Sequence, residues 1–367
     1  MRALAVLVML SACKIADTHF IGLGGDDAGG DGPHLDASGD ATLTTKRAYL
    51  IDSQSGIFVM ARATNGDLVF TSTSYPGGGI VASAMDPARK HLYVSLANPP
   101  KIRDFAVQMD GTLVPFGADV SIDTATCQPS HLAVSPNNTF LAVGCTTNHI
   151  ALIAIDAQLG LGGPIYSSAQ NATGEGVVAF AQNGNCLVAI DASASILQPQ
   201  NVHPFTVTPS GNLQPAAAVS GPTTVRTVAV DPSGQYVYVA GNGQLFYYSQ
   251  SPACALVGIG NMSAASTPNA IAFSPAGNTM EVIGDGVYAF MVSLGAPGTV
   301  PGSPFLSQTQ AILDGVFDPM LPVLYLTSPS FTGVLKATVD PNTGAITATT
   351  PTSSPETAHA IQLQLGP

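Results

Sequence analysis

A unit that recurs along most of the chain constrains the fold more than any other feature. In each copy a short apolar strand runs into an Asp/Ser-Pro pair and a turn, and a second apolar strand follows. These pairs are Asp86-Pro87, Ser135-Pro136, Asp231-Pro232, Ser274-Pro275 and Asp318-Pro319, with a degenerate copy at Ala181-Gln182. The successive steps are 49, 46, 50, 43 and 44 residues. A period near 45 with three or four strands per unit indicates the blades of a β-propeller.

The two ends of the repeated region complete one blade. Segment 359–367 (HAIQLQLGP) matches the first strand of the unit at 269–275 (NAIAFSP), and segment 46–58 resembles a blade without its first strand. Gly366-Pro367 lies 48 residues after Asp318-Pro319, in step with the other pairs. We therefore predict an all-β, seven-bladed propeller with four-stranded blades, closed by the C-terminal strand joining the N-terminal blade. Closure also covers strand edges that would otherwise be open to aggregation.

The first 45 residues do not fit the repeat. Residues 1–13 predict a lipoprotein signal peptide, because Arg2 precedes an apolar run and Leu10–Cys13 resembles a bacterial lipobox that ends at the lipidated Cys13. The apolar run is too short to span a bilayer. An ordinary signal peptide with a chance cysteine is the alternative. Residues 14–45, rich in Gly and Asp, predict a disordered tether, and 46–367 form the propeller.

The net charge and the predicted signal peptide together restrict where the protein is located and what it can bind. The net charge of −12 excludes a general nucleic-acid role, since phosphate binding needs a basic surface. We expect a monomer that is held at the membrane by its lipid anchor, without a cofactor, and that binds an unknown protein, glycan or small molecule. Lys14 after Cys13 is not an Asp retention signal, which favours the outer membrane or cell surface over the inner membrane.

Four cysteines remain besides Cys13. Export places them in an oxidising compartment, where disulfides persist, and four cysteines allow three pairings. Folding strand 132–134 back on 140–144 carries Cys127 close to Cys145, so we predict this disulfide. Cys186–Cys254 is then left by elimination. No Cys/His spacing is typical of zinc, and we expect no metal site.

Three blade segments carry a family resemblance. They read HLAVSPNNTFLAV (131–143), TVAVDPSGQYVYVA (227–240) and AIAFSPAGNTM (270–280). The chain resembles, over most of 46–367, the lactonase-type seven-bladed propeller family of bacterial 6-phosphogluconolactonases and fungal carboxy-muconate lactonising enzymes. The resemblance supports the fold and implies lactone hydrolysis as one activity, although a fold hosts many functions.

The resemblance also implies site residues. In that family the inner strand often opens with Gly-Pro-Arg-His, and the Arg and His point into the central channel. His131 stands at the His position, Arg226 at the Arg position, and Glu175 at the equivalent point of blade four. Arg226 would hold an oxyanion or a carboxylate, while His131 or Glu175 would activate water. The pattern is incomplete, because no blade keeps both Arg and His.

Two main functions follow from the sequence. The leading hypothesis is a binding or scaffold protein at the cell envelope, and the alternative is a lactone hydrolase with its site at the channel mouth. Phosphorylated sugar lactones are cytosolic, which argues against a 6-phosphogluconolactonase in this compartment. A third hypothesis is a surface protein whose blades present adhesive loops. Clustering of His131, Glu175 and Arg226 in one pocket would favour the enzyme, whereas their scattering would favour binding.

Overall fold

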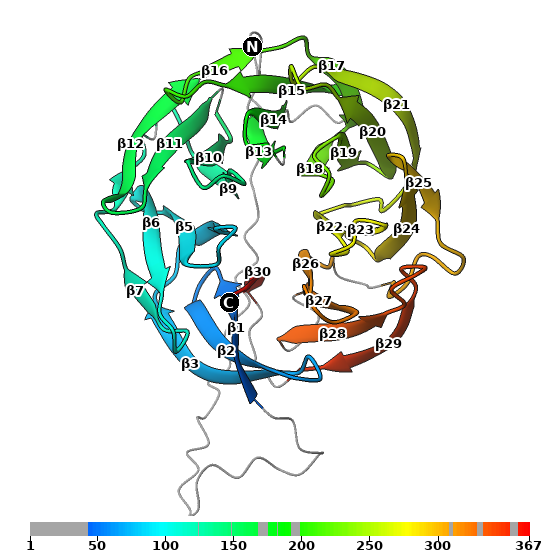
Figure 1. Cartoon of the computed structure of the whole chain (residues 1–367), viewed down its shortest axis with the longest axis horizontal. Coiled ribbons are helices and arrows are strands. Elements are labelled where there is room, and N and C mark those ends of the chain that lie inside the picture. The colour runs from blue at the N-terminus through cyan, green and yellow to red at the C-terminus, as the bar shows by residue number, and fades with distance from the viewer. Residues whose placement is uncertain are drawn as a thin grey trace, which may run out of the picture. The chain divides into compact units, whose positions relative to one another are not determined.

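The structure is a computed structural model of the chain. It describes residues 43–123, 125–147, 149–167, 175–181, 183–191, 199–307, 311–328, 333–352 and 359–367. Seven antiparallel blades surround a central opening, which confirms the predicted seven-bladed β-propeller (Figure 1). The predicted signal peptide, Cys13 and residues 14–42 of the predicted tether lie outside these residues. No helix within the described ranges has the length and apolar character needed to cross a membrane.

Each blade is numbered by its place in the ring, and its strands are given from the channel outward. Blade one contains β30 (Ala360–Leu365), β1 (Leu43–Asp52), β2 (Gly56–Ala63) and β3 (Leu68–Pro76). Blade two contains β4 (Ile80–Met85), β5 (His91–Ala97), β6 (Pro100–Val107), and then β7 (Leu113–Pro115) and β8 (Val120–Ser121), which both pair with β6. Blade three contains β9 (Pro129–Val134), β10 (Phe140–Cys145), β11 (Ile150–Asp156) and β12 (Gly160–Ser167).

The other four blades follow the same plan. Blade four contains β13 (Glu175–Phe180), β14 (Cys186–Asp191), β15 (Pro199–Val207), and then β16 (Leu213–Pro215) and β17 (Val219–Thr223), which both pair with β15. Blade five contains β18 (Val225–Val230), β19 (Tyr236–Gly241), β20 (Gln244–Gln250) and β21 (Leu256–Ser263). Blade six contains β22 (Ala270–Phe273), β23 (Thr279–Ile283), β24 (Val287–Ser293) and β25 (Ala296–Thr299). Blade seven contains β26 (Asp314–Phe317), β27 (Val323–Thr327), β28 (Val334–Val339) and β29 (Ile346–Pro351).

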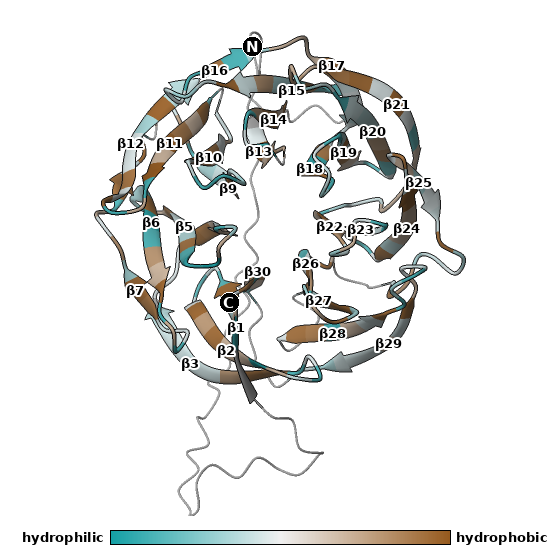
Figure 2. Ribbon diagram, viewed as in Figure 1, coloured by the Kyte–Doolittle hydropathy of each residue, from teal (hydrophilic) through white to brown (hydrophobic). Residues whose placement is uncertain are grey.

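The ring closes where the two ends of the repeat meet. Strand β1 pairs antiparallel with β30, with Tyr49 opposite Gln364 and Leu50 opposite Leu363. The N-terminal blade thus takes its innermost strand from the C-terminal segment, as predicted. The core lies in the seams between blades, where the second strand of a blade is buried along its whole length, as in β23 and β27. Both faces of such a strand pack against neighbouring blades, which requires near-continuous apolar runs (Figure 2).

The turn at the end of an inner strand is here called the marker turn, and in blades two, three, five, six and seven the Asp or Ser of the marker pair caps it. In blade three, Ser135 Oγ accepts hydrogen bonds from the N–H groups of Thr139 and Phe140, at 3.0 and 2.9 Å. In blade five, Asp231 Oδ1 accepts from the N–H groups of Gln235 and Tyr236, at 2.9 and 2.8 Å. A short polar side chain that satisfies loop N–H groups explains why Ser or Asp precedes the proline.

The turn at residues 64–67 of blade one differs from the type that its sequence favours. The Asn65-Gly66 pair favours a type I′ hairpin, which needs a positive φ at both residues. Only Gly66 has one, at 83°, and its N–H donates to the carbonyl of Ala63. This is the geometry of a type I turn followed by a glycine bulge. It recurs at Gly111, so the glycine rather than the asparagine determines these outer turns.

Buried tyrosines connect neighbouring blades. On the second strands of blades one, five and seven, the hydroxyls of Tyr49, Tyr238 and Tyr325 donate to the carbonyls of Gly111, Gly295 and Gly66. Each glycine lies in the outer turn of the next blade along the ring, and the last of these bonds joins blade seven to blade one. Tyr93 is buried on the second strand of blade two, but its hydroxyl has no hydrogen-bond partner among the described residues.

This contrast predicts different outcomes for the same substitution. Tyr238→Phe is expected to lower the free energy of unfolding by about 1 kcal/mol, because the Gly295 carbonyl loses its donor. Tyr93→Phe is expected to cost nothing or to stabilise, since it removes an unpaired buried hydroxyl. Urea unfolding of both variants measures the difference. Equal losses in the two proteins would contradict the role given to the hydrogen bond.

Both predicted disulfides are present. Cys127 and Cys145 bridge the start of blade three to the end of β10, with 5.0 Å between their Cα atoms. Cys186 and Cys254 join β14 of blade four to the loop that follows β20 of blade five, with 5.4 Å between Cα atoms. The hairpin register therefore identified the first pair correctly, and elimination identified the second.

Candidate functional site

One register position recurs on all seven inner strands. His131 pairs with Gly144, Thr227 with Ala240, and Asp314 with Thr327, each with the residue 13 positions later. This is the position five residues before the second residue of the marker pair, so its members lie at the same level of the channel. We call them the channel ring: Ala82, His131, Val177, Thr227, Ala270, Asp314 and Gln362.

A bulge precedes the ring on several strands. In blades one to five the strand pairing shifts just before the ring residue, so that one extra residue is inserted. The extra residues are Ile361, Val81, Ser130, Gly176 and Arg226. Bulges change the direction in which a side chain points. Arg226 therefore occupies a different position from the ring residue Thr227, and its side chain is exposed.

His131 lies on the ring in blade three. Its side chain is half-buried, and its Nδ1 atom is buried without a hydrogen-bond partner among the described residues. Burial lowers the pKa of the imidazole to about 4. The imidazole of His131 is therefore uncharged at neutral pH. It can donate or accept a hydrogen bond to a ligand without carrying charge.

The other two predicted residues are not joined to His131. Arg226 lies two blades away, and no hydrogen bond or ion pair connects the two within the described part of the chain. Glu175 begins β13 and pairs in register with Asp191 and with Cys145 of blade three. The side chain of Glu175 lies outside the described residues.

Asp314 is a ring residue that the sequence argument missed. Its half-buried carboxylate accepts a hydrogen bond from the N–H of Leu363, in the next blade, at 3.0 Å. Burial raises its pKa to about 6, against the lowering effect of the N–H groups of Leu363 and Gly315. The spacing used for His131, five residues before the marker proline, finds Asp314 when applied to blade seven. The family pattern names only Arg and His, and therefore does not point to an Asp at this position.

Two of the ring side chains form hydrogen bonds across the seams between blades. Gln362 Oε1 accepts from the N–H and the hydroxyl of Ser83 in blade two, at 2.6 and 2.9 Å, much as Asp314 bonds to blade one. At the same register, the Nδ1 atom of His131 has no hydrogen-bond partner among the described residues. This unpaired imidazole nitrogen distinguishes His131 from Gln362 and Asp314, the channel-ring residues that join blades.

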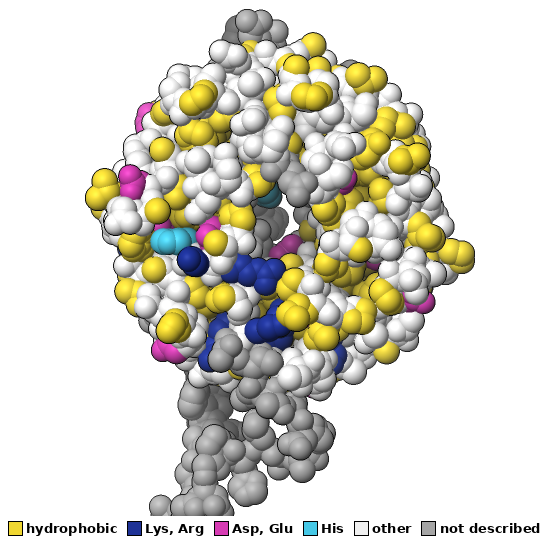
Figure 3. Space-filling model, viewed as in Figure 1, with side chains coloured by type: hydrophobic (Ala, Val, Ile, Leu, Met, Phe, Trp, Pro, Cys, Tyr) yellow, Lys and Arg dark blue, Asp and Glu magenta, His cyan; other side chains and the backbone are white. Residues whose placement is uncertain are grey.

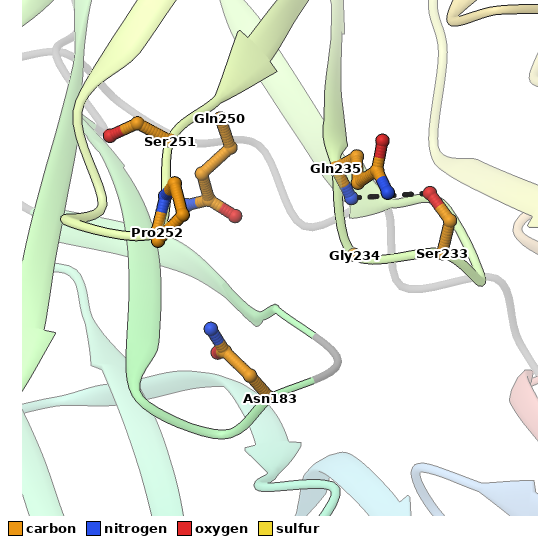
Figure 4. A pocket seen from close by; sticks show the side chains of 7 residues that line it. All are labelled: Asn183, Ser233, Gly234, Gln235, Gln250, Ser251 and Pro252. Atoms are coloured by element: carbon orange, nitrogen blue, oxygen red, sulfur yellow. Dashed lines mark hydrogen bonds between the residues drawn. The ribbon is translucent and has the colours of Figure 1, made fainter.

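A separate pocket of about 360 Å³ lies at the marker turns of blades four and five (Figure 4). Neutral hydrogen-bonding groups line it: Asn183, Ser233, Gln235, Gln250 and Ser251, together with Gly234 and Pro252. Both amide atoms of Gln250 are buried and have no hydrogen-bond partner among the described residues. A buried amide of this kind is normally satisfied by water or by a ligand.

Comparison with known proteins identifies similar folds. No family model and no curated protein matches the sequence. A proposed 6-phosphogluconolactonase from Bacteroides uniformis is 15% identical with a TM-score of 0.73, and the match covers 88% of this chain and 100% of that chain. A periplasmic gluconolactonase from Pseudomonas aeruginosa is 16% identical with a TM-score of 0.72, over 88% and 99% of the two chains. At these identities the likeness shows the fold, and the chain is a seven-bladed β-propeller like these lactonase-type structures.

Proposed function

We propose that the protein is an extracytoplasmic lactone hydrolase that acts on unphosphorylated sugar lactones inside the channel. The observation that supports this most is the shared register position, which puts His131 and Asp314 at one level with Arg226 one residue earlier on its own strand. A carboxylate with a pKa of about 6 is well matched to proton transfer near neutral pH. The likeness to solved lactonase-type propellers agrees with the proposal.

The reaction assigns one role to each group. The Asp314 carboxylate removes a proton from water, whose oxygen bonds to the lactone carbonyl carbon. The carbonyl oxygen becomes an oxyanion, which the Arg226 guanidinium stabilises. When the carbonyl re-forms, the bond from its carbon to the ring oxygen breaks, and the ring oxygen takes the proton back from Asp314. Neutral His131 hydrogen-bonds a sugar hydroxyl, and the product is a hydroxy acid.

The disulfides support a location outside the cytoplasm, because such bonds persist in oxidising compartments. We propose further that lipid on Cys13 holds the propeller at the membrane, with the outer membrane or cell surface favoured. An unphosphorylated substrate fits this location. An unphosphorylated substrate also fits the composition of the channel ring, because none of its seven residues is Lys or Arg.

The pH dependence of hydrolysis tests the proposal. With glucono-δ-lactone, the enzymatic kcat/KM is expected to rise with pH and to level off above a midpoint near 6, because Asp314 acts as the ionised base. Titration of His131 adds no inflection to the pH profile in this range, since its pKa is about 4. Spontaneous hydrolysis must be subtracted at each pH. A catalysed rate that falls as pH rises through 6 would exclude Asp314 as the base.

A binding role is the second candidate. The pocket in Figure 4 favours it, because the unpartnered Gln250 amide and its neutral neighbours suit the hydroxyl groups of a glycan or polyol. Titration of the protein with neutral sugars, with Gln250→Met as the comparison, tests this role. Binding that does not depend on Gln250 would count against this pocket.

A further inference from the structure

Arg89 occupies a backbone position that other blades give to Gly or Asn. It is the fourth residue of the blade-two marker turn and has a φ of 59°, in the left-handed region. The same position holds Asn138, Gly184, Gly234 and Gly277 in blades three to six, with φ between 53° and 71°. Gly and Asn are the residues that adopt this conformation most easily. An arginine there costs backbone energy, which points to a use for its side chain.

That side chain reaches a pocket on the other side of blade one. Arg89 lines an open pocket of about 360 Å³ together with the ends of the inner strands of blades six and seven, including Ile271, Phe273, Val316 and Phe317. The remaining lining residues are also uncharged. Figure 3 shows Lys and Arg side chains gathered beside the central opening. The pocket therefore combines apolar walls with a single cation, at the marker-turn end of the channel.

The acid that acts on Arg89, Asp318, is ion-paired with another arginine. Asp318 Oδ2 lies 3.0 Å from Arg62 Nη1, and both side chains are buried. Arg89 itself has a long hydrogen bond, 3.4 Å, to the carbonyl of Gly366. Burial and then the charge of Arg62 lower its pKa, although Asp318 acts in the opposite direction. An anion beside the guanidinium would relieve the unfavourable surroundings of this charge.

The other cations of blade two do not share this site. Lys101 and Arg103 both pair with Asp119, at 2.6 and 2.7 Å. Lys90 follows Arg89 directly but is exposed and does not line the pocket. The four cations of the blade-two sequence thus separate into an ion-paired outer pair, the exposed Lys90, and Arg89 at the channel.

We propose that the marker-turn end of the channel binds a small apolar molecule that carries one carboxylate. Arg89 makes a bidentate contact to the carboxylate, and the inner strands of blades six and seven cover the apolar body. One guanidinium matches one negative charge. The pocket starts one residue beyond the channel ring, because Ile271 and Gly315 directly follow the ring residues Ala270 and Asp314. Its lining does not include His131, Arg226 or Asp314, the residues assigned to hydrolysis.

Calorimetric titration of the full chain with benzoate tests this site, with benzyl alcohol as the uncharged match. Benzoate is expected to bind and benzyl alcohol to bind at least tenfold more weakly. Arg89→Gly is expected to reduce benzoate affinity at least tenfold, and its unfolding temperature should not fall, because glycine suits the φ of 59°. Lys90→Ala, the matched control, should bind as the natural protein does.

Three results would overturn the proposal. The first is equal benzoate affinity in the Arg89→Gly and natural proteins. The second is equal affinity of the natural protein for benzoate and benzyl alcohol. The third is no saturable benzoate binding up to about 10 mM, beyond the range expected for a ligand of this size in a formed site.

Discussion

Asp314→Asn is expected to lower kcat/KM for glucono-δ-lactone by about 10²-fold or more, which is the scale of a lost general base. The amide is close in shape to the carboxyl, and its oxygen can still accept the hydrogen bond from the N–H of Leu363. The seam between blades seven and one should therefore stay intact. Because the base acts in the transition state, the loss should fall on kcat rather than on KM.

A matched carboxylate provides the control. Asp156, exposed on the outer turn of blade three, caps the N–H groups of Gln158 and Leu159 and lies away from the channel. Asp156→Asn should hydrolyse the lactone at the natural rate. Steady-state kinetics of both variants, with circular dichroism to verify folding, makes the comparison. Full activity in Asp314→Asn would remove this residue from the mechanism.

Removal of the Cys186–Cys254 disulfide is expected to cost about 4 kcal/mol of unfolding free energy, the largest stability effect we predict. The bond closes a loop with a sequence separation of 68, against 18 for Cys127–Cys145, so it restricts the unfolded chain more. By the same chain-entropy relation, loss of the shorter loop should cost about 3 kcal/mol. Each bond is removed by replacing both of its cysteines with alanine.

Denaturant unfolding of the two double variants ranks the bonds. All four cysteines are buried, so the small cavity left by alanine is similar in both variants and largely cancels in the comparison. A larger loss for the Cys127–Cys145 variant would contradict the loop-length argument. It would indicate that local contacts in blade three, rather than the entropy of the unfolded chain, determine the effect.

The fold was predictable because its determinants repeat. A strand, an Asp/Ser-Pro turn and a second strand recur at one period, and the side chain that precedes the proline caps the turn, Ser135 in blade three and Asp231 in blade five. Closure by the C-terminal strand followed from a segment that stops at its own marker pair. The disulfide between Cys127 and Cys145 followed from hairpin register, because that pairing is local in sequence.

The site was less predictable because it depends on how blades meet. Only the register that Asp314 shares with His131 points to it in the sequence, and its raised pKa results from burial, which no local sequence pattern reveals. The bonds from Tyr238 and Tyr325 to the outer turns of neighbouring blades have no local sequence pattern. Arg89 is one of four cations in the blade-two sequence, and only its φ and its position against blades six and seven separate it from Lys101 and Arg103.

Hydrolysis of unphosphorylated sugar lactones by the purified protein, measured against the uncatalysed rate, is the most direct test of the central claim. We predict catalysed turnover that is lost in Asp314→Asn and in Arg226→Ala and retained in Asp156→Asn. Absence of turnover on glucono-δ-lactone and related lactones by the folded natural protein would contradict the enzyme proposal. That result would leave a binding protein, with the Gln250 pocket as the place to look for its ligand.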